Sequence, residues 1–227
     1  MTFRAYGPSY RVLGGTLAFA LCLGLGAGAA AQAAPAPQAP EPLPPGLHAT
    51  PPGLGRYPYS DADVAFMTGM IPHHAQAVIM AGWAPTHGAR KDVAILCERI
   101  VVAQRDEIRM MQGWLRDRGL PVPDATSTRM KMMMNGQEHD MLMPGMLSDE
   151  EMAALDRARG PEFDRLFLIG MIRHHQGAVD MVNTLFKSYG AAQDETIYKF
   201  ASDVYADQSI EIARMKQMLQ ESPDPRQ

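Results

Sequence analysis

The sequence Phe66-Met-Thr-Gly-Met-Ile-Pro-His-His-Ala-Gln-Ala-Val-Ile-Met80 recurs 101 residues later as Phe167-Leu-Ile-Gly-Met-Ile-Arg-His-His-Gln-Gly-Ala-Val-Asp-Met181. At roughly 100° per residue, the first methionine, both histidines and the last methionine of each copy share one helix face. These positions are Met70, His73, His74 and Met80 in the first copy, and Met171, His174, His175 and Met181 in the second. The pattern predicts two equivalent helices, each with thioether and imidazole donors on a single face.

A second helix is predicted after each copy of the motif. Its pattern Gln104-x-x-Glu107-Ile108-x-x-Met111-x-x-x-Leu115 recurs as Gln208-x-x-Glu211-Ile212-x-x-Met215-x-x-x-Leu219. These helices span about residues 89–118 and 192–221, and Gly119 and Pro121 terminate the first because glycine tolerates positive φ and proline lacks an N–H. Each half is therefore a helical hairpin. Two repeated hairpins that share a core predict an all-α four-helix bundle.

Capping patterns mark the expected helix starts, which are Ser60 with Asp63, Ser148 with Glu151, and Gly160-Pro161. The Ser148 pattern opens a short helix between the two hairpins. Pro72 is expected to interrupt and kink the first motif helix, because it removes one backbone donor. The second copy has Arg173 at this position, so the motif itself does not require the kink.

Composition divides the chain into three parts. Residues 1–34 resemble a Sec-type signal peptide, with Arg4 and Arg11 before an apolar run and Ala31-Gln32-Ala33 as the cleavage site. An uncleaved membrane anchor is the alternative, because the apolar run approaches the ~18 residues of a membrane helix. Residues 35–58 form a Pro-rich tether that is expected to stay extended and unable to order itself. Residues 59–221 form the bundle domain, with repeat one at 59–118, a Met-rich linker at 119–159 and repeat two at 160–221.

The predicted location is the periplasm or the exterior of the cell, and the mature chain there carries a single cysteine. Cys97 has apolar neighbours at helical spacing and is predicted to be a small buried residue rather than a ligand. A net charge of -4 does not indicate the excess positive charge that binding to nucleic acid requires, or that binding to an anionic membrane surface after signal cleavage requires. Neither is expected as a partner, and the oligomeric state is left open.

The linker is unusually long and rich in methionine. It carries Met130, Met132, Met133, Met134, His139, Met141, Met143 and Met146. Loops of this length are commonly functional or disordered, and a loop has no core for methionine to fill. We expect these side chains either to capture metal ions or to be exposed without a function.

The histidine and methionine faces have two interpretations. In the structural one, methionine fills the core and each histidine is satisfied across the bundle by Glu107, Glu211, Gln104 or Gln208. In the functional one, imidazoles and thioethers converge between the hairpins and bind a soft ion such as Cu(I), which thioethers prefer in an oxidising compartment. Repetition of the whole pattern in an exported chain favours the metal site.

The motif Phe-x-x-Gly-Met-Ile-x-His-His-x-x-Ala-Val-x-Met, with Gln-x-x-Glu-Ile-x-x-Met after it and Met143-Pro-Gly-Met146 in the linker, resembles domain-of-unknown-function family 305 over about residues 59–220. This exported, ferritin-like family includes copper-binding proteins of the CopM type. The resemblance implies copper binding in tolerance or trafficking, with ligands at Met70, His73, His74, Met80, Met171, His174, His175 and Met181. Secondary candidates are Met67, Met111, Met215, His139, Met141, Met143 and Met146, although Met111 and Met215 fit packing positions better. Because Pro72 and Arg173 differ, as do Ile79 and Asp180, the two half-sites need not be equivalent.

The expected function is therefore non-enzymatic capture of Cu(I), with Cu(II) and Ag(I) as further ions and a copper-transfer protein as a candidate partner. A ferritin-like di-metal oxidase is one alternative. It would need Glu-x-x-His pairs, but Met70 and Met171 stand three residues before His73 and His174. The other alternative is a helical module that binds a protein partner through its Met-rich linker.

Overall fold

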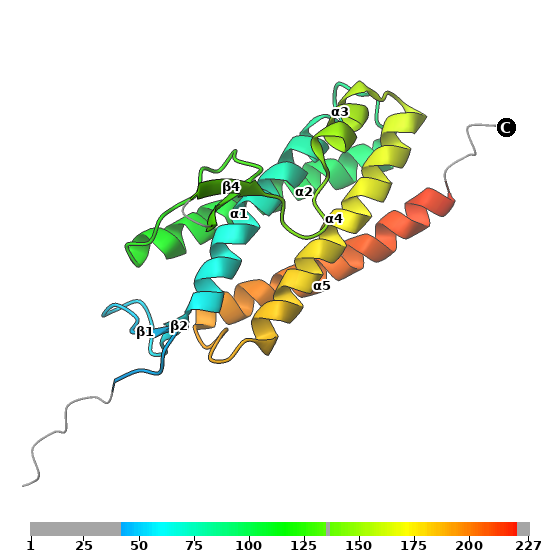
Figure 1. Cartoon of the computed structure of the whole chain (residues 1–227). Helices are drawn as coiled ribbons and strands as arrows, with labels where there is room; N and C mark the ends of the chain where they lie inside the picture. Colours follow the sequence, from blue (N-terminus) through cyan, green and yellow to red (C-terminus); the bar gives the residue numbers. More distant parts are fainter. Residues whose placement is uncertain (1–41, 135–136, 222–227) are drawn as a thin grey trace, which may run out of the picture. The chain divides into compact units, whose positions relative to one another are not determined.

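The computed structural model describes residues 42–134 and 137–221, and the predicted signal segment lies outside these residues. The described chain is mostly helical, as predicted. The described residues form five helices, labelled in Figure 1: α1 (Asp61–Gly82), α2 (Lys91–Asp117), α3 (Asp149–Arg157), α4 (Pro161–Lys187) and α5 (Glu195–Gln220). Within the described ranges, no helix combines the length and apolar character needed to cross a bilayer.

The predicted capping patterns are confirmed. Ser60 and Asp63 form a reciprocal capping box at the start of α1, and Ser148 and Glu151 form another at α3. Gly160 has φ 56° and directly precedes Pro161 at the first turn of α4. The predicted interruption at Pro72 is wrong: α1 is a continuous helix from Asp61 to Gly82. Pro72 is buried there, so packing holds the helix across the missing donor.

The prediction that residues 35–58 stay extended and unordered is wrong for the part that the structure describes. Strand β1 (Leu47–His48) pairs antiparallel with β2 (Tyr59–Ser60), just before α1. The His48 Nε2 atom lies 2.6 Å from Asp61 Oδ1, and its ring stacks on Tyr59 with the centroids 5.1 Å apart. Pairing with the helix start supplies the contacts that the Pro-rich composition lacks by itself.

The Met-rich linker also contains strands, which the all-α prediction missed. Strand β3 (Met130–Met134) pairs antiparallel with β4 (Gln137–Met141), in a register that sets Met130 opposite Met141 and Met132 opposite His139. An ion pair between Lys131 and Glu138 joins the strands, with an N–O distance of 2.5 Å. Methionine lacks the β-branched signature of a strand, so composition indicated a loop.

The core is built by three helix pairings: α1 with α2, α4 with α5, and α1 with α4. A methyl group of Met181 on α4 lies at Gly69 near the start of α1, whereas a methyl group of Met80 near the end of α1 lies at Gly170 on α4. The motif helices α1 and α4 therefore run in opposite directions, as Figure 1 also shows.

Two apolar clusters fill the core. The first gathers the early part of α1, the late parts of α2 and α4, and the early part of α5, and includes Met70, Met111, Met181 and Phe200. The second gathers the opposite ends of the same helices, and includes Met80, Cys97, Met171 and Met215. Between the two clusters, each long helix contributes buried polar residues. We call this group the polar layer; it consists of His73, His74, Gln104, His174, His175 and Gln208.

Candidate metal centre

The four histidines of the polar layer are completely buried, each with 0% of its surface exposed. They come from the middle of α1 and α4, where the two motif helices cross. The rings of His73 and His174 are closest, with centroids 3.8 Å apart. The structure thus brings together the four imidazoles that the repeated motif predicts.

Two of the imidazoles are held by carboxylates of the flanking helices. His74 Nε2 lies 2.7 Å from Glu107 Oε2 on α2, and His175 Nε2 lies 2.7 Å from Glu211 Oε2 on α5. Since a carboxylate oxygen accepts, each Nε2 carries the proton and donates it. The glutamate partners named by the structural interpretation are therefore confirmed.

The other two imidazoles donate to backbone carbonyls. His73 Nε2 lies 3.0 Å from the carbonyl oxygen of Pro144 in the linker, and His174 Nε2 lies 3.0 Å from that of His73. A carbonyl oxygen also only accepts, so these rings too have their proton on Nε2. Neither bond is predictable from residue types, because both acceptors are main-chain atoms.

In all four histidines, these hydrogen bonds use Nε2 and leave the other ring nitrogen, Nδ1. The Nδ1 atoms of His73, His74, His174 and His175 are buried and have no hydrogen-bond partner among the described residues. Burial lowers the pKa of His73 to about 3, with the charge of His74 as the next cause, and burial likewise holds the pKa of His174 well below its usual value. These two rings are neutral, so each Nδ1 presents a lone pair inside the protein.

Gln104 and Gln208 add two more unpartnered atoms to the layer. Their side chains are 3% and 4% exposed, and within the described chain neither Oε1 atom has a partner. The structural interpretation offered them as partners of the histidines, but the imidazole bonds go to Glu107, Glu211 and carbonyls instead. Among the described residues, no three His, Cys, Asp or Glu side chains are grouped so that they could hold a metal ion without other ligands.

The four primary methionines lie on both sides of the polar layer. Met70 and Met181 belong to the first apolar cluster, and Met80 and Met171 belong to the second. Three of them are 0% exposed and Met181 is 7% exposed. The structure therefore places thioethers in both clusters that border the imidazoles.

The secondary candidates divide into three groups. Met67, Met111 and Met215 are fully buried in the apolar clusters, where they pack. His139 and Met141 are exposed on the β3–β4 hairpin. Met143 and Met146 lie in the linker segment after the hairpin, and the Met146 sulfur accepts from the Met143 backbone N–H at 3.2 Å.

Residues 143–147, which we call the strap, cross the motif helices beside His73. Gln76 on α1 binds Leu147 twice: its Nε2 donates to the Leu147 carbonyl at 3.0 Å, and its Oε1 accepts from the Leu147 N–H at 2.7 Å. On α4, a Cβ atom at Gly177 would lie 1.9 Å from the carbonyl oxygen of Pro144, so only glycine allows this approach.

Arg173 provides a further support for the strap. Its guanidinium binds Glu151 on α3 at 2.7 and 2.5 Å and contacts the carbonyl oxygens of Gly145 and Met146 at 3.4 Å. These strap-holding roles were not predicted from the sequence. The available signal was the difference between the copies, since Pro72 and Gln76 in the first correspond to Arg173 and Gly177 in the second.

Cys97 is buried in the second apolar cluster, as predicted. Burial, together with the nearby charge of Asp164, raises the pKa of its thiol to about 12. The side chain therefore stays protonated and acts as an apolar residue.

The polar layer comes near the surface at one side. A cleft of about 850 Å³ is lined by residues that include Glu107, Met110 and Phe200. The Phe200 ring packs edge-on against His74, with the centroids 6.3 Å apart. The carboxylate that fixes the His74 tautomer thus faces the cleft, while the imidazole lies behind an aromatic ring.

Comparison with known structures finds the same fold in other proteins. A DUF305 protein from Streptomyces coelicolor that is assumed to be secreted is 28% identical, with a TM-score of 0.60 over 71% of this chain and 93% of that one. A DUF305 fragment from Deinococcus radiodurans is 27% identical, with a TM-score of 0.58 over 72% and 98%. No curated protein sequence matches the chain.

CopM is similar as well. Its Cu(I)-bound form is 29% identical, with a TM-score of 0.54 over 70% of this chain and 96% of that one, and its Cu(II)-bound form is 30% identical. CopM structures are also known with silver and in the apo form. The model of the family described as a domain of unknown function, DUF305, matches residues 63–219. This chain belongs to the DUF305 family.

Proposed function

We propose that this protein is an exported copper-binding protein that takes up Cu(I), and also Ag(I) or Cu(II), with methionine and histidine ligands. One observation carries the proposal: four buried imidazoles donate their Nε2 protons to acceptors, and their Nδ1 atoms have no hydrogen-bond partner within the part of the chain that the structure describes. Leaving a buried polar atom unpaired costs about 1–3 kcal/mol. A metal ion bound to Nδ1 would satisfy these atoms.

The chemistry of the surrounding groups supports this function. A metal-binding histidine usually donates its other ring N–H to a carboxylate or carbonyl, which fixes its tautomer and orientation. His74 and His175 have such a carboxylate in Glu107 and Glu211. Methionine sulfur beside the imidazoles favours a soft monovalent ion, and we infer that thioethers of Met70, Met80, Met171 and Met181 complete the coordination.

The family supports the choice of ion. CopM, which shares the fold, has been solved with Cu(I), Cu(II) and silver. We carry this property to the present chain because its own donors suit the same ions. We propose a role in copper tolerance or trafficking, with a copper-transfer protein as partner. This role fits an exported protein whose donors suit metal binding rather than catalysis.

We also propose that the four long helices form a ferritin-like bundle of two related hairpins. Equivalent contacts support the relation. Asp63 at the start of α1 accepts from the Ala192 N–H ahead of α5 at 2.8 Å, and Asp164 at the start of α4 accepts from the Arg90 N–H ahead of α2 at 3.2 Å. Each hairpin is thereby fastened to the other.

A non-enzymatic role suits this bundle better than di-metal oxidation. Ferritin-like oxidases hold two metal ions with glutamates and Glu-x-x-His pairs. Here Met70 and Met171 occupy the position of that glutamate, and both are buried beside the imidazoles. Glu107 and Glu211 accept hydrogen bonds from imidazole Nε2 atoms.

The test is an anaerobic Cu(I) titration of residues 35–227 against a competing chelator, with metal counted per chain. One variant changes Met70, Met80, Met171 and Met181 to leucine, because such swaps in a core usually cost under about 1.5 kcal/mol each. A second variant changes His73, His74, His174 and His175 to glutamine. The control changes Met67, Met111 and Met215 to leucine.

We expect tight stoichiometric binding by the natural chain and by the control, and at least about a tenfold loss in each four-residue variant, as for ligands that contribute more than about 1.4 kcal/mol. Circular dichroism identifies any variant that fails to fold. Absence of binding by the natural chain would overturn the proposed copper binding. Unchanged affinity in both folded variants would overturn the proposed bundle ligands and move the site to the Met-rich linker.

A further inference from the structure

Each motif helix packs a methionine against a glycine of the other motif helix. The Met181 methyl carbon from α4 lies 3.5 Å from the point where a Cβ of Gly69 would be, and the Met80 methyl carbon from α1 lies 3.4 Å from the equivalent point of Gly170. Gly69 and Gly170 hold the same position in the two copies of the motif. Each glycine thus makes room for a thioether of the opposite helix, which gives two half-sites that we name after Met80 and Met181.

The strap makes these half-sites different. At Gly69, the Met143 methyl carbon and sulfur lie 2.7 and 3.4 Å from the Cβ point, so the Met181 half-site has a second thioether. At Gly170, the corresponding neighbour is the Leu147 side chain, with Cδ2 at 3.2 Å. At the Met80 half-site, an alkyl side chain that cannot bind a metal ion therefore takes the place that the Met143 thioether has at the Met181 half-site.

Access also differs between the half-sites. A groove of about 290 Å³ opens on the Met181 side, lined by residues that include Phe66, Met143, Pro144, Asp180 and Met181. Met181 is 7% exposed, whereas Met80 is 0% exposed.

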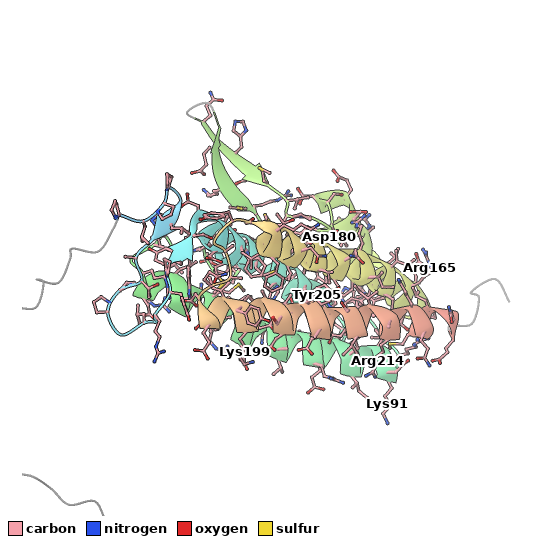
Figure 2. All side chains as sticks on the ribbon, turned by 90° about the horizontal axis from the view of Figure 1, so that it is seen from below. Lys91, Arg165, Asp180, Lys199, Tyr205 and Arg214 are labelled. Atoms are coloured by element: carbon pink, nitrogen blue, oxygen red, sulfur yellow. The ribbon has the colours of Figure 1, made fainter. Side chains whose placement is uncertain are left out.

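A carboxylate marks the open side as well. Asp180 is exposed, and Figure 2 labels it on α4. Its Oδ1 accepts from Gln176 Nε2 at 3.1 Å, and the first copy of the motif has Ile79 at the equivalent position. A cation that approaches the groove thus meets a negative charge, which the Met80 half-site lacks at this position.

We propose that the Met143–Met181 thioether pair is the site where a soft monovalent ion, Cu(I) or Ag(I), enters the protein, and that it fills before the Met80 half-site. The inference rests on the proposed function and adds to it an order of loading. The pair lies close to the polar layer. Pro144 follows Met143 in the chain, and its carbonyl oxygen accepts a hydrogen bond from His73, which belongs to the layer.

The larger cleft near Glu107 is a poorer route for such an ion. Among the described residues that line it, the thioether is that of Met110, and Phe200 stands between the cleft and His74. A thioether pair binds a soft ion better than a single thioether beside carboxylates does.

The test is an Ag(I) titration of residues 35–227 labelled with ¹³C at the methionine methyl groups and with ¹⁵N at the histidine rings, followed by NMR. Leucine variants assign each methyl signal. We expect the Met143 and Met181 signals to shift below one Ag(I) per chain, and the Met80 signal to shift only with further Ag(I). In Met143→Leu, the early shift of Met181 should be lost. In Leu147→Met, which gives the other half-site a second thioether, Met80 should shift together with Met181.

The outcomes separate this inference from the proposed function. If Ag(I) moves no methionine or imidazole signal, both fail. If Met80 shifts first, or if all signals shift together in the natural chain, the ordered loading fails while metal binding stands. If the Met181 shift is unchanged in Met143→Leu, Met143 is not part of the site and the thioether pair is wrong.

Discussion

Gln76 and Gly177 occupy the same position in the two copies of the motif, and both contact the strap from opposite helices. Gln76 binds the backbone of Leu147 through both ends of its amide, while Gly177 lets the Pro144 carbonyl approach α4. At this position the first copy has a side chain that forms hydrogen bonds, and the second copy has no side chain. The strap is thus fixed beside His73 by a difference between two otherwise similar helices.

Gly177→Ala should destabilise the protein. A methyl group 1.9 Å from a backbone oxygen cannot be accommodated without displacing the strap or the helix, and overpacking of this kind costs about 1–3 kcal/mol. Gly113→Ala is the matched control. Gly113 lies within α2, and apart from its chain neighbours and the backbone of its own helix no atom of the described residues lies within 4 Å of its Cβ point; there alanine should stabilise by up to about 1 kcal/mol. Urea unfolding measures both, and equal effects would contradict the close approach.

Glu107→Gln should weaken Cu(I) binding while leaving the fold intact. The carboxylate accepts from Nε2 and so fixes the orientation and tautomer of His74, and loss of such a partner typically lowers metal affinity by about 10–100-fold. Glu98→Gln is the control, since Glu98 is exposed on the same helix. Chelator competition gives the affinities. If the two variants bind alike, Glu107 has no part in metal binding.

Arg173→Gln should reduce stability more at neutral pH than in acid. The hydrogen bond and charge of Arg173 hold the pKa of Glu151 below its ordinary value of 4.5. The stabilisation is therefore present above the unfolded-state pKa and disappears as the pH falls through the lower folded-state pKa. The pair is half exposed, with side-chain exposures of 48% and 45%, so its contribution is at most about 1 kcal/mol.

The measurement is urea unfolding of this variant and the natural chain at pH 7 and near pH 3. Arg165→Gln serves as the control, because Arg165 pairs with Glu162 within α4 and does not touch the strap. Hydrogen exchange at the Leu147 amide, which Gln76 holds, should speed up only in the Arg173 variant. Equal exchange in both variants would show that Arg173 does not support the strap.

Cys97 should be chemically silent in the folded protein. Its thiol is buried and its pKa is raised to about 12, so a thiolate-directed reagent should label it only after unfolding. Cys97→Ala should keep the Cu(I) stoichiometry. Rapid labelling of the native chain, or loss of one bound ion in the variant, would mean that the thiol takes part in binding.

The repeat made the helices and the imidazole pairs predictable. Apolar spacing and capping residues are local signals, so the starts of α1 and α3 followed from Ser60 and Ser148. The burial of His73 and His174 followed from their helix face. The pairing of His74 with Glu107 was among the predicted alternatives, because both helices repeat together.

The rest of the site depends on contacts that no local pattern records. The acceptors of His73 and His174 are carbonyl oxygens, which every residue carries. Gln76 and Gly177, which are distant from the strap in sequence, determine its position. The β3–β4 hairpin is rich in methionine, which lacks strand propensity. Continuity of α1 through Pro72 reflects tertiary packing, which overrides local propensity.

The central claim, that metal binds at the Nδ1 atoms of imidazoles whose Nε2 protons are already committed, is tested most directly by ¹⁵N–¹H correlation NMR of the histidine rings. Spectra are compared for residues 35–227 without metal and loaded with Cu(I). We predict Nε2–H tautomers for His73, His74, His174 and His175 without metal. On loading, their Nδ1 signals should shift while the Nε2 protons remain. Nδ1–H tautomers in the metal-free chain, or bound copper that leaves every Nδ1 signal unchanged, would contradict the account.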